Sequence, residues 1–117
     1  MTDEPGRVFR DAWIAGVRER FPGEPEAGCV APWEETPEWE RHAATAVAAQ
    51  VRDFVEISGG NAVRLTREQK GRFVATCWIA QVHKHVASPE PSHVADWAEL
   101  PAWRRETDAD IFEALQG

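Results

Sequence analysis

The sequence predicts an all-α fold of four main helices, arranged as two tandem helix-loop-helix repeats with pseudo-two-fold symmetry. Residues 6–17 match residues 71–82 at 6 of 12 positions, and residues 30–41 match residues 94–105 at 7 of 12 positions. The two matches have nearly the same offset, 65 and 64 residues, and self-similarity at a fixed period indicates a repeated structural unit. No stretch alternates apolar and polar residues in the way that would predict a sheet.

A chain of 117 residues has the length of one compact domain. We expect a single domain over residues 1–117, with repeat 1 at 6–57, a linker at 58–65 and repeat 2 at 66–117. One repeat alone, at about 60 residues, would be marginally stable because so short a chain buries too little of its surface. The repeats are therefore expected to share one core, each covering an apolar face that the other leaves open.

Apolar residues at helical spacing predict the two helices of the first repeat. Pro22-Gly23 stops the first helix. Thr36-Pro37 is expected to open the second, as a capping hydroxyl followed by proline at the first helical position. The glycine-containing stretch at 58–61 ends it. The two apolar stripes are Val8, Phe9, Ala12, Trp13, Gly16, Val17 and Phe21, and then Ala43, Ala44, Val47, Ala48, Val51, Phe54 and Val55.

The second repeat restarts at a capping box, with Thr66 at the N-cap and Gln69 at position N3. The stretch 88–91 breaks this third helix, and Pro101 opens the fourth, which runs to the end of the chain. The apolar stripes are Phe73, Val74, Cys77, Trp78, Val82 and Val86, and then Ile111, Phe112 and Leu115. Three short segments could be extended: Val63 to Leu65, and the residues around Val30 and Val94.

Composition excludes several classes of function. The formal net charge is -7, from 13 basic and 20 acidic residues, whereas a sequence-independent grip on nucleic acid needs clustered Lys and Arg. No apolar run approaches the length of a membrane span, and the start of the chain at 1–4 is acidic where a secretory signal is basic. Two cysteines do not make a disulfide framework. We therefore expect a cytoplasmic protein with neither nucleic-acid nor membrane partners.

The six tryptophans fall into three pairs at matching positions: Trp13 and Trp78, Trp33 and Trp97, and Trp39 and Trp103. The first pair lies on apolar helical stripes, so both side chains are expected to be largely buried. The other four mark the corner where each loop enters its second helix.

An arginine follows each of these corners. A planar ligand could stack on the indoles while the guanidinium holds an anionic group. The predicted ligand-binding residues are Trp97, Trp103, Arg105, Trp33, Trp39 and Arg41. The same residues could instead be structural, with the tryptophans packing the corner and Arg41 and Arg105 tied to Glu35 and Glu99.

The corner resembles the repeats named for the ryanodine receptor, the RyR family. In that family a helix with a tryptophan is followed by a loop, an extended segment with a valine, an aromatic residue, a Leu-Pro helix start and an arginine near the first turn. The second repeat has Trp78, Val94, Trp97, Leu100-Pro101 and Arg105 in these places, and the first has Trp13, Val30, Trp33, Thr36-Pro37 and Arg41. The resemblance implies a bacterial sensor of nucleotide-like signals or an interaction module.

Histidines and acids do not form a recognisable catalytic or metal-binding motif. Zinc needs four converging ligands, whereas His83 and His85 are two residues apart and point in nearly opposite directions on a helix. Asp108 and Asp110, near the start of the fourth helix, are attributed to the helix dipole. The sequence contains no nucleophile elbow and no phosphate-binding glycine loop. We therefore expect no enzymatic activity, no metal and no cofactor.

The sequence thus predicts a small, non-enzymatic binding or interaction module. It would recognise a nucleotide-like or anionic small ligand through the Trp/Arg corner, with the more charged second repeat carrying the site. The alternative is a protein-protein adaptor or homodimer that has no small-molecule ligand and whose tryptophans all belong to the core.

Overall fold

The computed structural model describes residues 4–117, which form four α-helices, five short 3₁₀ helices and no strand. The α-helices are α1 (Glu4–Arg20), α2 (Glu38–Ile57), α3 (Arg67–His85) and α4 (Ala102–Gln116). The predicted all-α class with four main helices is confirmed. None of the described helices is long and apolar enough to cross a membrane. Residues 1–3, which belong to the acidic start of the chain, lie outside the described residues.

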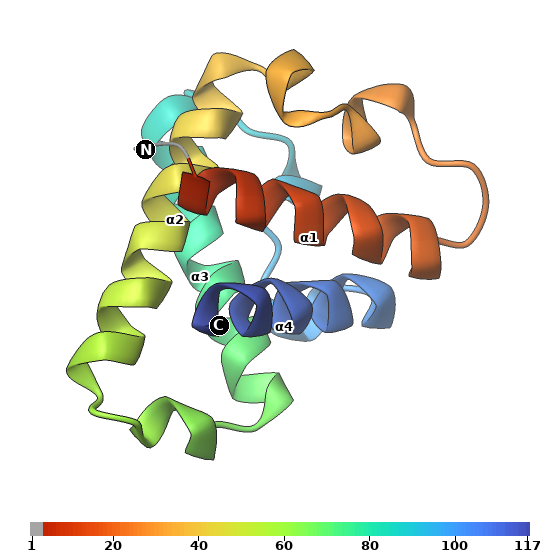
Figure 1. Ribbon diagram of the computed structural model, residues 1–117. Coiled ribbons are helices and arrows are strands. Elements are labelled where there is room, and N and C mark those ends of the chain that lie inside the picture. Colours follow the sequence, from red (N-terminus) through yellow and green to blue (C-terminus); the bar gives the residue numbers. More distant parts are fainter. Residues whose placement is uncertain (1–3) are drawn as a thin grey trace.

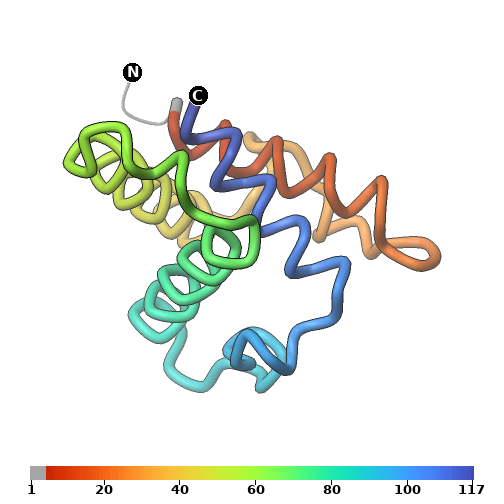
Figure 2. Tube along the Cα trace, turned by 90° about the horizontal axis from the view of Figure 1, so that it is seen from below, coloured from red at the N-terminus to blue at the C-terminus, as the bar shows by residue number. Residues whose placement is uncertain are grey.

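The helices pack as antiparallel neighbours around one core. α1 and α4 lie side by side and run in opposite directions in both views (Figures 1 and 2). α2 and α3 also pack together and run in opposite directions in Figure 1. Each of these pairs joins the first half of the chain to the second. The fully buried side chains of the core cluster come from α2, α3 and α4: Val47, Ala48, Val51, Val74, Ile111 and Phe112. Val17 of α1 is fully buried as well.

The segments between the α-helices contain short 3₁₀ turns flanked by single residues with extended backbone angles. These are η1 (Ala27–Val30), η2 (Trp33–Glu35), η3 (Asn61–Arg64), η4 (Pro91–His93) and η5 (Trp97–Glu99). The expected extended segments are present only in part. Leu65, Ala31 and Pro32 have extended backbone angles, whereas Val63 lies in η3, Val30 lies in η1 and Val94 is not extended. A short segment with no neighbouring strand must satisfy its backbone groups locally. It does so here through i to i+3 hydrogen bonds, such as the one from the amide of Val94 to the carbonyl of Pro91 (3.2 Å).

The helix ends follow the sequence signals except at one position. The capping box is confirmed. The backbone N–H of Gln69 donates a hydrogen bond to the Thr66 hydroxyl, and the backbone N–H of Thr66 donates one to the side-chain oxygen of Gln69. Thr36 is not the cap of α2. The N-cap is Pro37, and the Thr36 hydroxyl donates instead to the carbonyl of Pro32 (2.9 Å). The 3₁₀ turn immediately before α2 supplies that acceptor and draws the hydroxyl away from the helix.

Glycines in α1 and α3 bring each helix against a tryptophan. A Cβ atom on Gly6 would lie 2.7 Å from Cη2 of Trp33, and one on Gly71 would lie 2.5 Å from Cη2 of Trp97. The guanidinium of the arginine after each glycine lies over the same ring, 5.9 and 6.0 Å from the centroids. Both halves of the chain also have the order helix, two 3₁₀ turns, helix. The duplication itself stays a prediction.

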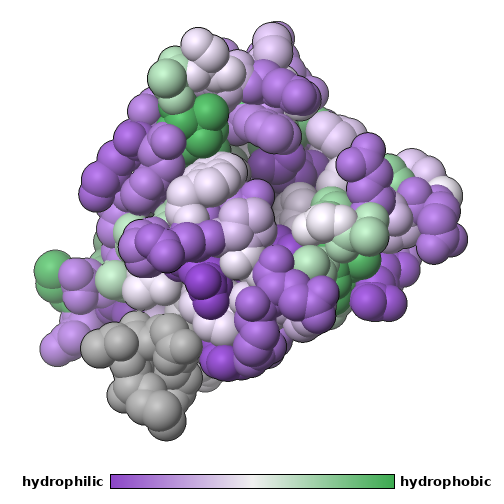
Figure 3. Space-filling view, turned by 90° about the horizontal axis from the view of Figure 1, so that it is seen from above, coloured by the Kyte–Doolittle hydropathy of each residue, from purple (hydrophilic) through white to green (hydrophobic). Residues whose placement is uncertain are grey.

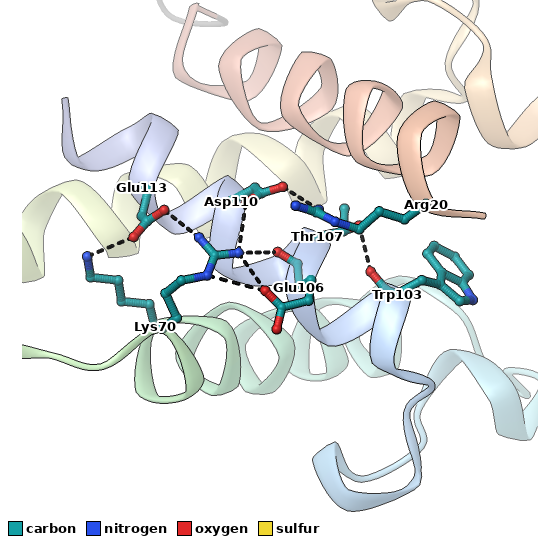
Figure 4. Close-up of polar contacts among 8 residues, drawn as sticks. Arg20, Lys70, Trp103, Glu106, Thr107, Asp110 and Glu113 are labelled. Carbon is teal, nitrogen blue, oxygen red and sulfur yellow. Dashed lines mark hydrogen bonds and ion pairs between the residues drawn. The ribbon is translucent and has the colours of Figure 1, made fainter. Parts of the chain in front are cut away.

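Ion pairs tie α4 to both α1 and α3 (Figure 4). Arg20, at the end of α1, pairs with one oxygen of Asp110, and Arg67, at the start of α3, reaches the other at 2.9 Å. Arg67 also pairs with Glu113 at 2.6 Å, and Lys70 pairs with the same carboxylate at 3.2 Å. Burial tends to raise the pKa of Asp110, but the hydrogen bonds from Arg20 and Arg67 hold it below its usual value. Asp110 therefore serves contacts between helices rather than the helix dipole.

Substituting the helix glycine tests the close approach of α3 to Trp97. We expect Gly71→Ala to lower the free energy of unfolding by about 1–3 kcal/mol, the usual cost of overpacking. The new methyl group would meet the indole and, at 3.0 Å, the backbone oxygen of Arg105. Alanine is itself the better helix former by about 1 kcal/mol, so a net loss reports on packing.

Urea denaturation measures the change, and Gly28→Ala is the matched control. No atom lies within 4 Å of a Cβ built on Gly28, so its effect should stay within about 0.5 kcal/mol. Equal losses for the two variants would show that the Trp97 contact does not constrain α3.

Candidate ligand-binding cavity

A cavity of about 640 Å³ lies where the four α-helices meet the segment between α1 and α2. Each α-helix contributes one tryptophan to the wall: Trp13, Trp39, Trp78 and Trp103. Residues between 21 and 37, together with His93 and further side chains of the four helices, form the remaining wall. On the outer face seen in Figure 3, polar side chains dominate and apolar ones appear in small separate patches. The volume is typical of small-molecule sites, which span roughly 300–1,000 Å³.

The tryptophan rings are held in place by contacts between the two halves of the chain. Trp13 packs against Trp103 with ring centroids 5.9 Å apart, and Trp39 packs against Trp78 at 6.1 Å. The Nε1 of Trp13 also donates a hydrogen bond to the carbonyl of Cys29 (2.9 Å). Tilted and offset aromatic pairs of this kind are mutually attractive. Trp13 and Trp78, expected to be largely buried, are partly buried and pack against the core while lining the cavity.

The structure brings three of the six predicted ligand-binding residues to the cavity: Trp33, Trp39 and Trp103. Trp33 is only 5% exposed and belongs to the core cluster. Trp39 and Trp103 are less deeply buried. The two predicted corners thus contribute to one shared cavity instead of forming two separate sites.

Trp97, Arg41 and Arg105 do not line the cavity. Trp97 packs on α3, and its Nε1 is buried without a hydrogen-bond partner. Arg41 and Arg105 are partly exposed. Among the described residues, no ion pair joins Arg41 to Glu35 or Arg105 to Glu99.

Two other arginines line the cavity, and sequence reasoning did not single them out. Arg10 is 7% exposed and donates hydrogen bonds to the carbonyls of Gly28 and Ala31, both at 3.0 Å. It thereby fixes the covering segment, and burial lowers its pKa against the opposing effect of Glu40. The guanidinium of Arg104 lies 5.2 Å from the ring centroid of Trp13, and its Nε is buried without a partner.

Asp108 is a buried acid in the cavity wall. It is 4% exposed, and its Oδ2 has no hydrogen-bond partner. Burial raises its pKa to about 7, against the opposing effect of Arg104 one turn earlier. The attribution of Asp108 to the helix dipole is therefore wrong. The dipole acts on the first turn and lowers the pKa of an acid, whereas Asp108 is the seventh residue of α4.

The cavity lining can recognise a ligand through the flat indole rings and through two buried polar atoms. Arg104 Nε is a donor and Asp108 Oδ2 an acceptor, four residues apart on one helix and both unpartnered. Burial also raises the pKa of the Cys29 and Cys77 thiols, which favours the weakly nucleophilic protonated form. The described residues contain no group of three or more His, Cys, Asp or Glu side chains that could hold a metal ion.

No protein-family model, curated protein or solved structure matches the chain. The resemblance to the RyR family stays a prediction that rests on the corner residues. Pro101 is the N-cap of α4, as expected from its place as a sequence signal for a helix start.

The raised pKa of Asp108 predicts a pH-dependent stability. An acid whose pKa is higher in the folded than in the unfolded chain makes folding less favourable as the pH rises between the two values. For Asp108 that window runs from about pH 4, the usual value for an aspartate, to about 7. We expect Asp108→Asn to gain stability relative to the wild type by about 1 kcal/mol per pH unit across this window.

Urea denaturation of both proteins between pH 4.5 and 8.5 measures this difference, which should become constant above the folded-state pKa. Parallel stability curves would show that Asp108 titrates normally. The remaining titratable groups of the lining are common to both proteins, so their effects cancel: Arg10, Glu26, Cys29, Glu35, Glu40, His93 and Arg104.

Proposed function

We propose that this protein is a non-enzymatic binding module that takes up a small planar ligand in the tryptophan-lined cavity. One observation carries the proposal: four helices each place a tryptophan around a space that also contains the unpartnered Asp108 carboxyl. A buried polar group without a partner costs about 1–3 kcal/mol. A ligand with a complementary group would offset that cost.

The sequence-based proposal of a Trp/Arg corner changes in one respect. Trp39 and Trp103 keep their proposed role as stacking surfaces, since both line the cavity. The role of the arginine moves from Arg105 to its neighbour Arg104, whose guanidinium is already stacked on Trp13. A nucleobase-like ring suits these walls in shape, because it is flat and carries donors and acceptors at its edge.

We also propose that the two halves are copies of one unit and that the cavity forms between them. The contact between Trp13 and Trp103 joins α1 of the first half to α4 of the second. The contact between Trp78 and Trp39 joins α3 of the second half to α2 of the first. This exchange is the arrangement that a pseudo-two-fold axis would produce. Neither half alone would enclose the cavity.

Indole NMR signals test the uptake of a planar ligand. On titration with adenine, an uncharged planar probe, the Nε1–H signals of Trp13, Trp39, Trp78 and Trp103 should shift together. The signal of Trp97 should stay in place and serves as the internal reference. No shift at the four cavity signals, up to the solubility of adenine and of indole as a second probe, would overturn the proposal.

A pair of variants places the binding in the cavity. Trp39→Leu removes one aromatic wall and should weaken adenine binding about fivefold, equivalent to roughly 1 kcal/mol of stacking. Arg105→Ala should leave the affinity unchanged because Arg105 lies outside the lining. The opposite pattern would mean that the corner around Arg105 is the site.

The alternative function, a protein-protein adaptor or homodimer, is favoured by two exposed apolar side chains. Ile57, the last residue of α2, and Val63, in the link between α2 and α3, are 84% and 72% exposed. If they join two copies of the chain, sedimentation velocity should detect a dimer that Ile57→Glu converts to a monomer. A wild-type monomer at all accessible concentrations would exclude the homodimer.

A further inference from the structure

We infer that the cavity selects an organic cation, a protonated amine or amidinium on a flat body, and that the positive group binds at Asp108. This inference rests on the proposed function, because it assigns a charge to the ligand of the same cavity. It departs from the anionic ligand expected from the sequence. Three independent features of the lining support it.

The first feature is the balance of charge. Four carboxylic acids line the cavity against two arginines, in a chain whose formal net charge is -7. Glu26 and Glu35 are exposed, whereas Glu40 and Asp108 lie deeper. Acidic groups at the mouth of a cleft raise the local concentration of cations and repel anions.

The second feature is that each arginine of the lining already interacts with other groups of the protein. Arg10 holds the carbonyls of Gly28 and Ala31 and lies 3.9 Å from Glu40. Arg104 is stacked on Trp13. Arg10 therefore has no open guanidinium fork to bind a carboxylate or phosphate through two parallel hydrogen bonds. Arg104 has Asp108 one turn further along the same helix, and the opposite charge of that carboxylate weakens its attraction for an anion.

The third feature is the distribution of cations over the indole faces. Arg7, Arg72 and Arg104 lie over Trp33, Trp97 and Trp13, at 5.9, 6.0 and 5.2 Å from the ring centroids. Within the described residues, the three tryptophans that have no arginine or lysine over the ring are Trp39, Trp78 and Trp103. All three line the cavity.

Asp108 gives the cation its anchor. Its carboxyl is removed from water and has an unpartnered oxygen. A cation bound there would stabilise the charged form and complete its hydrogen bonding, whereas an anion would be repelled. Indole faces attract cations most strongly among the aromatic side chains, so the two recognition elements favour the same ligand charge.

Three probes of the same shape and different charge test the inference on the full chain: benzamidine, benzamide and benzoate. Each is titrated at pH 7.5 while the indole Nε1–H signals are followed. We expect benzamidine, a cation at this pH, to bind about tenfold more tightly than neutral benzamide, since one charge-assisted contact is commonly worth that factor. Benzoate should bind most weakly.

Two aspartate variants identify the anchor. Asp108→Asn should lower the affinity for benzamidine about tenfold and that for neutral benzamide by a clearly smaller factor. Asp53→Asn is the matched control, because Asp53 is exposed on α2 and outside the cavity lining, and the net charge changes equally. If both variants lower the affinity alike, general attraction and not Asp108 selects the cation, and the assignment of the anchor fails.

The wild-type titrations separate this inference from the proposed function. If benzamide or benzoate shifts the four cavity signals at concentrations as low as benzamidine does, the cavity binds planar molecules without regard to charge. The inference then fails and the proposed function stands. If none of the three probes moves those signals, and adenine and indole do not either, both fail.

Discussion

Contact between the first helix of one half and the second helix of the other holds this molecule together. α1 can lie against α4 because Gly16 leaves room for Thr107, where a Cβ atom would come within 2.5 Å of the threonine methyl. α2 meets α3 through aromatic packing, with Phe54 and Phe73 5.2 Å apart. Neither half could bury its apolar face by itself, so folding of one half depends on the other. The cavity walls depend on both halves in the same way, because each half contributes residues to the lining.

Two acids on α4 show how partners decide the state of a carboxyl. Asp108 and Asp110 are two residues apart and therefore lie on different faces of the helix. Asp110 is held by Arg20 and Arg67, which keep its pKa below the usual value. Asp108 belongs to the cavity lining, its Oδ2 has no hydrogen-bond partner, and burial raises its pKa to about 7. The paired acid stabilises helix packing, whereas the unpaired one lowers the stability of the fold when it is ionised.

Much of the fold could be predicted from local signals. The helices, the breaks after α1 and α2 and the Thr66 capping box depend on residues close in sequence. Thr36 was misread because the competing acceptor, the carbonyl of Pro32, belongs to a 3₁₀ turn that apolar periodicity does not reveal.

Local sequence signals predict only part of the candidate site. Matching positions marked Trp39 and Trp103, but a cavity built from four helices depends on how those helices cross, which spacing along one chain does not determine. Arg104 and Asp108 carried a local signal, since residues four apart share a helix face, and Asp108 is too far into α4 for the dipole to explain it. Arg10 carried a similar one, three residues before Trp13 on the same face.

The two halves of the chain contribute side chains of different charge to the cavity. Counting 64 residues from the first half, Arg104 takes the position of Glu40, and Asp108 takes that of Ala44; all four line the cavity. Two identical chains related by a true two-fold axis would present the same groups from both sides, and a ligand could then enter in either of two equivalent orientations. A single chain can vary each side independently. A molecule bound here would meet Glu40 from α2 and the pair Asp108 and Arg104 from α4, so its two possible orientations would not be equivalent.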